Sequence, residues 1–158
     1  MASDCFISMD QVPGEANDKG FPGAIEVSGW NWGLSAPRDL STAARKGVAD
    51  IRHFTFNHAV DTASAGLMSR CATGVPIPKA TLTQRRAGGQ ASQRFIEIKF
   101  TQVHIVEVSL ATSGGNDIPQ EEVSFSFESV SFDYTPQSSA GADKSGRHNF
   151  SWVAGTTK

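Results

Sequence analysis

Apolar and polar residues alternate along most of this chain. Alternation of this kind is typical of β-strands that bury one face, because successive side chains of a strand point to opposite sides. It predicts strands at residues 5–9, about 24–34, 51–56, 80–85, 95–108, 123–134 and 149–153. The chain is therefore expected to be mainly β.

In three of these segments the apolar positions change parity. The changes fall at Ser28 and Gly29, on both sides of residues 103–105, and at Ser129. An inserted bulge residue has this effect, and glycine tolerates the unusual backbone angles that bulges require. Long strands with bulges bend sharply, so the pattern predicts a β-barrel of two curled antiparallel sheets.

One short flanking helix is expected, at about residues 61–72. Asp61 can cap its first turn, and Gly74 and Pro76 follow its end. Loops are expected at residues 18–23, 35–47, 87–92, 113–119 and 137–146, where turn-forming and polar residues gather.

The composition favours a single folded domain over residues 1–158, with 39% hydrophobic and 19% charged residues. No stretch approaches the roughly 18 apolar residues of a membrane-spanning helix. A net charge of -2 argues against a nucleic-acid-binding surface. The start, MASDCFISMDQ, lacks the basic region and apolar run of a secretory signal peptide. Cys5 and Cys71 have no metal-ligand spacing, so both are expected to be reduced and to pack as small apolar residues.

The histidines and serines form no recognisable catalytic pattern. His53 and His58 are expected on opposite faces of a strand, and neither His104 nor His148 has a carboxylate or thiolate at a zinc-ligand spacing. There is no G-x-S-x-G turn for a serine nucleophile. The sequence therefore predicts no catalytic residue and no metal site.

The remaining polar clusters have simple structural interpretations. The glycine-rich stretch after Arg85 and Arg86 lacks the Lys-Ser/Thr of a phosphate-binding loop, which favours a hairpin turn. Glu121, Glu122 and Glu128 are interpreted as solvated positions on alternating strands. We therefore expect no cofactor and no enzyme activity.

The stretch VSGWNWG at residues 27–33 places Trp30 and Trp32 on one face of a strand and Asn31 on the other. A tryptophan pair of this kind can fill a core or can form an exposed platform for sugar rings, and the core interpretation is favoured. The opposite face then carries small polar residues suited to water or to cargo, namely Asn31, Ser124, Ser126 and Ser131.

Several motifs occur in a characteristic order along the chain. They are W-x-W-G (Trp30, Trp32, Gly33), an F-x-F strand followed by V-D-x-A-S and a helix that ends at Cys71, A-x-L-T-x-R-x-A-G-G (residues 80–89, with Gly88 and Gly89), V-x-F-D-Y-x-P-Q (130–137) and a closing F-x-W that contains Trp152. As a set, over about residues 4–153, they resemble the haemolysin-coregulated protein (Hcp) family, the tube protein of bacterial type VI secretion systems.

This resemblance implies a barrel of two sheets with one helix, assembled into hexameric rings that stack into a hollow tube. It implies partners as well: further copies of the chain, a spike protein at the tube tip, sheath proteins around the tube and small effectors in the lumen. The protein would leave the bacterial cytoplasm by the type VI route, without a cleavable signal peptide.

Two hypotheses about site residues follow. Asn31 is expected to face the lumen and contact cargo. The loop at residues 34–50, glycine-poor compared with many family members, is expected to contact the next ring through Arg38, Arg45 and Lys46. The alternatives left open are a sugar-binding β-sandwich module and a phage-type tail tube protein.

Overall fold

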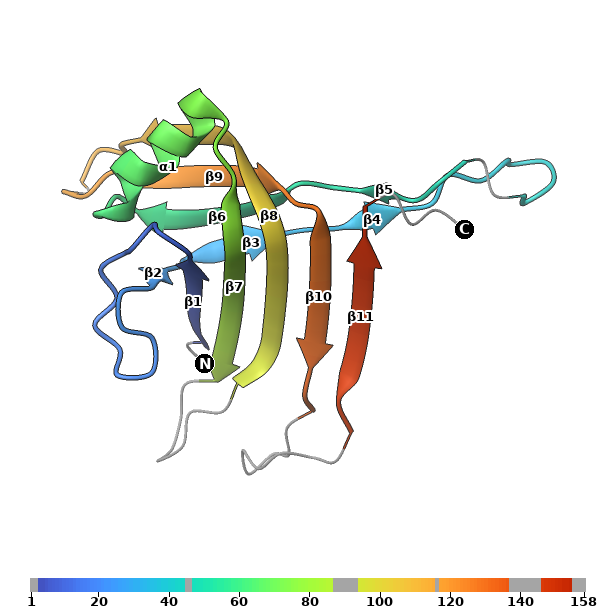
Figure 1. Ribbon diagram of the computed structural model, residues 1–158, viewed down its shortest axis with the longest axis horizontal. Coiled ribbons are helices and arrows are strands. Elements are labelled where there is room, and N and C mark those ends of the chain that lie inside the picture. Colours follow the sequence, from blue (N-terminus) through green and yellow to red (C-terminus); the bar gives the residue numbers. More distant parts are fainter. Residues whose placement is uncertain (1–2, 45–46, 87–93, 116, 137–145, 155–158) are drawn as a thin grey trace.

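The computed structural model describes residues 3–44, 47–86, 94–115, 117–136 and 146–154 (Figure 1). As the alternation predicts, these residues are mainly β, with antiparallel sheets and one helix. The helix is α1 (Ala63–Thr73), and the strands are β1 (Ser3–Met9), β2 (Ile25–Glu26), β3 (Gly29–Asn31), β4 (Leu34–Ser35), β5 (Asp50–Ile51), β6 (Phe54–Ala59), β7 (Ile77–Arg86), β8 (Arg94–Ala111), β9 (Gln120–Ser126), β10 (Ser129–Tyr134) and β11 (His148–Val153).

The larger sheet has the order β2, β1, β7, β8, β10, β11, and every neighbouring pair is antiparallel. Its inner face is apolar: Ile7 lies opposite Leu82, which lies opposite Ile98. The adjacent row of paired positions faces the other way and consists of Ser8, Thr81, Lys99, Ser131 and Ser151. The two-residue period of the strands thus separates the core from a polar outer face.

The smaller sheet has the order β3, β6, β9, β8. In Figure 1 its strands β3, β6 and β9 run across the upright strands β7, β10 and β11. Within the described residues, β3 and β11 each pair on one side only. As far as these residues show, each sheet has an open edge.

Strand β8 belongs to both sheets. Its first half pairs with β7 and β10, and residues 104–111 pair with β9. Between the two halves, Gln102 has a φ of 48°, in the left-handed region, and the buried positions change from even to odd numbers there. A second register shift falls between Ile105 and Glu107. Both predicted parity changes in this strand are confirmed.

The other two parity changes have a different cause. Residues 24–34 contain three short strands, of which β2 pairs in the larger sheet and β3 in the smaller one. Similarly, β9 lies in the smaller sheet and β10 in the larger one. The prediction of continuous bulged strands was wrong here, because the chain ends one strand and crosses to the other sheet. Gly29 is not among the glycines with a positive φ, so the prediction that it adopts an unusual backbone conformation was wrong.

The core centres on a cluster of aromatic rings contributed by both sheets. Phe125 is fully buried, and its ring centroid lies 5.0 Å from that of Phe100 and 5.2 Å from that of Phe54. Phe127 lies 5.0 Å from Phe100 and 6.3 Å from Trp152. Contacts of this kind add to the stabilisation from burying the rings.

Helix α1 begins and ends as its sequence indicates. The Asp61 carboxylate accepts a hydrogen bond of 2.9 Å from the backbone N–H of Ala63. At the other end Gly74 has a φ of 75°, and its N–H donates to the carbonyl of Arg70 at 2.9 Å. Leu67 is fully buried and belongs to the core cluster.

Both cysteines are free thiols, with Cys5 buried and Cys71 half-buried. Burial raises the pKa of the Cys5 thiol to about 12, which keeps it protonated and unreactive at neutral pH. Among the described residues no helix has both the length and the apolar character needed to span a membrane.

Candidate functional site: a polar sheet face and a projecting arm

The tryptophans of the VSGWNWG stretch pack against the core. Trp30 stacks on Phe54, with ring centroids 5.6 Å apart, and its indole N–H donates to Gln84 Oε1 at 3.0 Å. The indole N–H of Trp32 donates to the carbonyl of Arg52 at 3.0 Å, and Gly33 lies beside that same arginine. Because these rings are partly buried and their N–H groups are used, they do not form the exposed platform that a sugar-binding module needs.

Asn31 is exposed and begins a polar row across the smaller sheet. It lies opposite Thr55, which lies opposite Ser124, which in turn lies opposite Glu107. The hydroxyl groups of Thr55 and Ser124 are hydrogen bonded at 2.8 Å. We call Asn31, Thr55, Ser124 and Glu107 the polar row.

The structure also divides the polar set predicted from sequence. Ser124 and Ser126 both lie in the smaller sheet, where Ser124 is opposite Glu107 and Ser126 is opposite His104. Ser131, by contrast, lies on β10, between Lys99 and Ser151 on the outer face of the larger sheet. The assignment of Ser131 to the face of Asn31 was therefore wrong, because the chain changes sheets between β9 and β10.

Residues 34–44 and 47–51 belong to a hairpin arm that projects from the body at one end of its longest axis (Figure 1). Asp39 organises its loop by accepting hydrogen bonds from Ser41, through both the hydroxyl and the backbone N–H, and from the N–H of Thr42. These bonds, that of the Ser41 hydroxyl foremost, lower the pKa of Asp39. Arg38 donates to the carbonyl of Ala43 at 3.1 Å. Leu40 is completely exposed, with a relative accessibility of 105%.

Some residues of the predicted sites lie outside the described residues, namely Arg45 and Lys46 in the arm and Gly88 and Gly89 in the β7–β8 connection. Trp152, on β11, packs on the core through Phe127. The structure therefore locates Arg38 and Asn31 on separate parts of the molecule, the arm and the polar row.

Arg85, next to the glycine-rich connection, is already bound to carboxylates of the same chain. Its guanidinium forms ion pairs with Asp4 and Asp18 and lies over the rings of Phe6 and Phe21. The hydrogen bond from Arg85, followed by that from the Gly20 N–H, lowers the pKa of Asp18. This cluster fixes the loop of residues 13–24 on the larger sheet, a structural role for the arginine.

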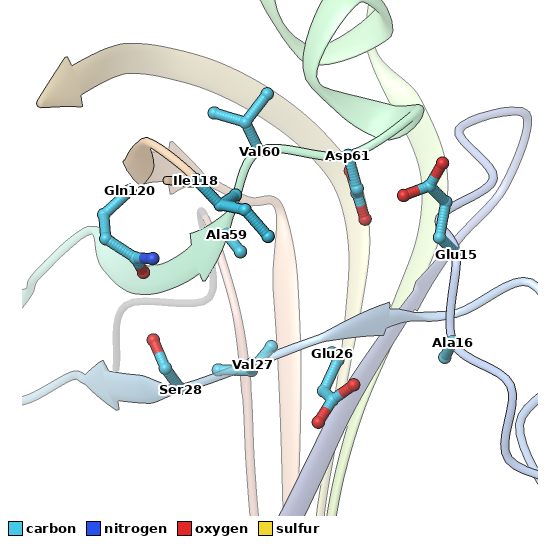
Figure 2. Close-up of a pocket in the computed structure, with 10 residues that line it drawn as sticks. All are labelled: Glu15, Ala16, Glu26, Val27, Ser28, Ala59, Val60, Asp61, Ile118 and Gln120. Carbon is cyan, nitrogen blue, oxygen red and sulfur yellow. The ribbon is translucent and has the colours of Figure 1, made fainter. Parts of the chain in front are cut away.

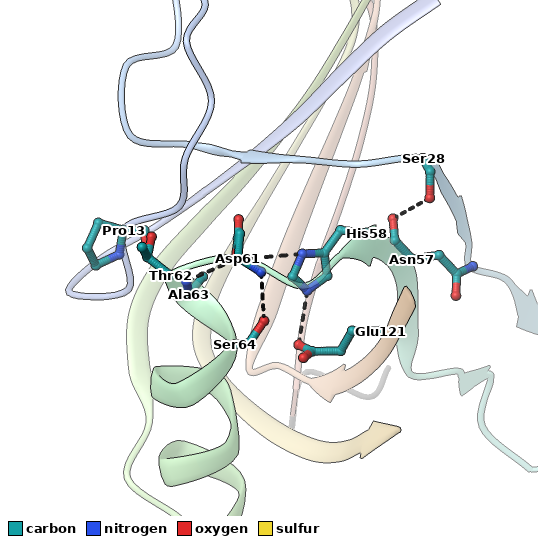
Figure 3. Close-up of polar contacts among 9 residues, drawn as sticks. All are labelled: Pro13, Ser28, Asn57, His58, Asp61, Thr62, Ala63, Ser64 and Glu121. Atoms are coloured by element: carbon teal, nitrogen blue, oxygen red, sulfur yellow. Dashed lines mark hydrogen bonds and ion pairs between the residues drawn. The ribbon is translucent and has the colours of Figure 1, made fainter. Parts of the chain in front are cut away.

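A buried polar pair was missed in the sequence. His58 Nε2 and Glu121 Oε1 lie 3.0 Å apart with both side chains fully buried, and His58 Nδ1 lies 3.8 Å from Asp61 Oδ1 (Figure 3). The interpretation of Glu121 as solvated was wrong. The alternation in the sequence marks both residues as buried. Glu121 lies two positions before buried Val123 and His58 lies two positions after buried Phe56, so each shares a strand face with a core residue. Among the described residues, no group of three or more metal-ligand side chains is found.

Comparison with known proteins gives a consistent result. The family model "Type VI secretion system effector, Hcp" matches residues 6–134. Protein hcp1 of Pseudomonas aeruginosa is 33% identical over 154 residues, which cover 96% of this chain and 95% of that protein. A type VI secretion system effector from Yersinia pestis has a TM-score of 0.79 at 31% identity, covering 96% of this chain and 100% of its own. A further solved type six secretion system protein has a TM-score of 0.90 at 28% identity, covering 99% of both chains.

Proposed function

The chain belongs to the Hcp family of type VI secretion proteins, and on this basis we propose that it is a structural tube subunit that forms hexameric rings. The family consists of secreted tube proteins rather than enzymes. The observation that carries the proposal is that, within the described residues, β3 and β11 each pair on one side only, and that the apolar side chain of Phe150 on β11 is exposed. An open edge of this kind is an aggregation hazard in a monomer, and pairing around a closed ring removes it.

Further parts of the proposal concern the assembled tube. The two sheets joined through β8 serve as the barrel of each subunit, and the polar row lines the lumen, where small effectors travel. Rings stack into a tube that carries a spike protein at its tip and is propelled by sheath proteins. The small hydroxyl and amide groups of the polar row support a lumen role, because they can bond to water or to cargo without a specific apolar pocket.

The experiment that tests this function is a mass measurement by light scattering on a sizing column, with negative-stain images of the peak. A six-fold particle with a central hole supports the tube subunit. A monomer over a wide range of concentrations contradicts it.

Substitution of Asn31 tests the lumen assignment. Asn31→Asp and Asn31→Gln are expected to reduce effector capture by about tenfold, the effect of losing one or two well-placed hydrogen bonds. Rings are expected to form normally, because pairing along the edge of β3 uses backbone groups, and the Asn31 side chain is exposed and outside the core. The measurement is co-purification of a co-expressed type VI effector with the rings, and Ser151→Gln on the larger sheet is the control. Loss of rings, or unchanged capture, would count against the assignment.

Rising salt tests the role of charge in stacking. Arg38, Arg45 and Lys46 add positive charge to the arm, so tubes are expected to shorten between about 0.05 and 0.5 M salt as exposed charges are screened. Tube length is measured from negative-stain images while light scattering follows the rings. If tube length does not change with salt concentration, attraction between charges is not what holds the rings together.

A further inference from the structure

A cleft lies at the end of the molecule opposite the arm, where β2, the end of β6 and the start of α1 meet (Figures 1 and 2). Its volume is about 430 Å³, within the range of ligand-binding pockets. Apolar side chains line part of it, namely Ala16, Val27, Ala59, Val60 and Ile118. Ile118 is 56% exposed, so this wall can cover the apolar part of a ligand.

The rest of the cleft is acidic. Glu15, Glu26 and Asp61 line it, and none of its described lining residues is basic. Glu15 and Glu26 are exposed and form no ion pair within the described residues, whereas Glu97 on the larger sheet is paired with Lys99 at 3.2 Å. Unbalanced negative charge in a concave site attracts cations.

Asp61 is the most buried of these acidic groups. Its side chain is 10% accessible, and its Oδ1 accepts a hydrogen bond of 2.9 Å from the N–H of Ala63. The fully buried His58 lies behind it, with Nδ1 at 3.8 Å from the same oxygen (Figure 3). The other oxygen, Oδ2, has no hydrogen bond or ion pair within the described residues, and Figure 2 shows the side chain directed into the cleft. Burying a carboxylate with an unpaired oxygen is unfavourable, so a cation that enters the cleft offsets this cost.

The donor set favours an organic cation over a metal ion. Among the described residues no group of three or more His, Cys, Asp or Glu side chains could hold a metal. A guanidinium group binds best to both oxygens of a carboxylate, and one oxygen of Asp61 is already used by the N–H of Ala63. A primary ammonium group is a compact charge that can bond to a single oxygen.

We propose that the cleft is a binding site for a primary ammonium group on a short apolar stem, with the ammonium at Asp61 Oδ2 and the stem against Ile118. Glu15 and Glu26 add attraction at longer range. Free alkylamines and the lysine side chains of a protein share this chemistry. The described lining comes from one chain, so the inference goes beyond the tube function and does not depend on it.

The test is a titration of the full chain with n-pentylamine and with lysine blocked at both ends, followed by ligand-detected NMR. The uncharged n-pentanol is the control ligand. The dissociation constant of pentylamine is expected to be on the order of 1 mM, with pentanol about tenfold weaker because it lacks the charge. Binding of the blocked lysine as well supports a protein side chain as the ligand, whereas binding of pentylamine alone supports a free amine.

Substitutions locate the site. Asp61→Asn is expected to weaken pentylamine binding about tenfold, the effect of losing a hydrogen bond between charged groups. Asparagine keeps an oxygen for the N–H of Ala63, so the start of α1 is preserved. Glu26→Gln, at an exposed position of β2, is expected to weaken binding about twofold through the loss of longer-range attraction. Glu128→Gln removes an exposed carboxylate outside the cleft and is the matched control, with binding expected to be unchanged.

Three results would overturn the site: no saturable binding of pentylamine, equal binding of pentylamine and pentanol, or equal effects of Asp61→Asn and Glu128→Gln. None of them bears on the tube function, because light scattering on the same samples reports the rings separately.

Discussion

Replacing Phe125 with alanine is expected to lower the free energy of unfolding by about 3–5 kcal/mol, the range for deleting a buried aromatic side chain. Phe125 is fully buried at the centre of the aromatic cluster, in contact with Phe54, Phe56, Phe100 and Phe127. These rings come from both sheets, so the surroundings cannot close around the cavity without separating strand pairs.

The measurement is urea unfolding followed by tryptophan fluorescence, at one protomer concentration because assembly adds to apparent stability. Phe95→Ala is the control, since Phe95 is half-buried and its only ring contact among the described residues is with Arg86. The control substitution is expected to lower the free energy of unfolding by about 1 kcal/mol, near the average for single substitutions. Equal losses for the two variants would show that the cluster does not hold the sheets together.

The second large effect is expected for Glu121→Ala. It removes the partner of His58 Nε2 and leaves a fully buried imidazole with no acceptor at 3.0 Å. Breaking a buried pair in this way costs about 3–5 kcal/mol. Replacing both residues with leucine is expected to recover most of the loss, because a well-packed apolar pair of similar size often matches a buried polar pair.

The free energy of unfolding of the wild type, Glu121→Ala and the double leucine variant is measured under the same conditions as for Phe125. Glu122→Ala is the matched control, since Glu122 is the exposed neighbour on the same strand. A Glu121→Ala protein as stable as the Glu122→Ala control would contradict a structural role for the buried pair.

Much of the fold could be predicted because a strand that buries one face must alternate. The same rule located the positions where the chain changes sheets, but it could not tell a bulge from a crossing. At Gln102 the strand continues with a left-handed residue, whereas at Ser129 a new strand begins in the other sheet. The two cases give the same parity change, and only the long-range pairing separates them.

The candidate site was less accessible to sequence reasoning. The exposure of Asn31 follows from its position between two tryptophans. The burial of Glu121 was not predicted, because glutamate is rarely buried and this was given more weight than its place on the same strand face as the core residues. The projection of the arm has no local signal, because residues 36–44 lack a regular apolar period and their path depends on hydrogen bonds within the loop. The cleft is formed by segments far apart in the chain, so no short motif marks it.

The continuity of β8 through both sheets has a mechanical consequence. A pull on one sheet reaches the other along covalent bonds, so the two layers cannot slide apart without breaking backbone pairing on both sides of Gln102. Loaded along the strand, the ladder is sheared, and many hydrogen bonds must rupture together rather than one after another. A subunit built around such a strand can transmit a sudden thrust without its two halves parting.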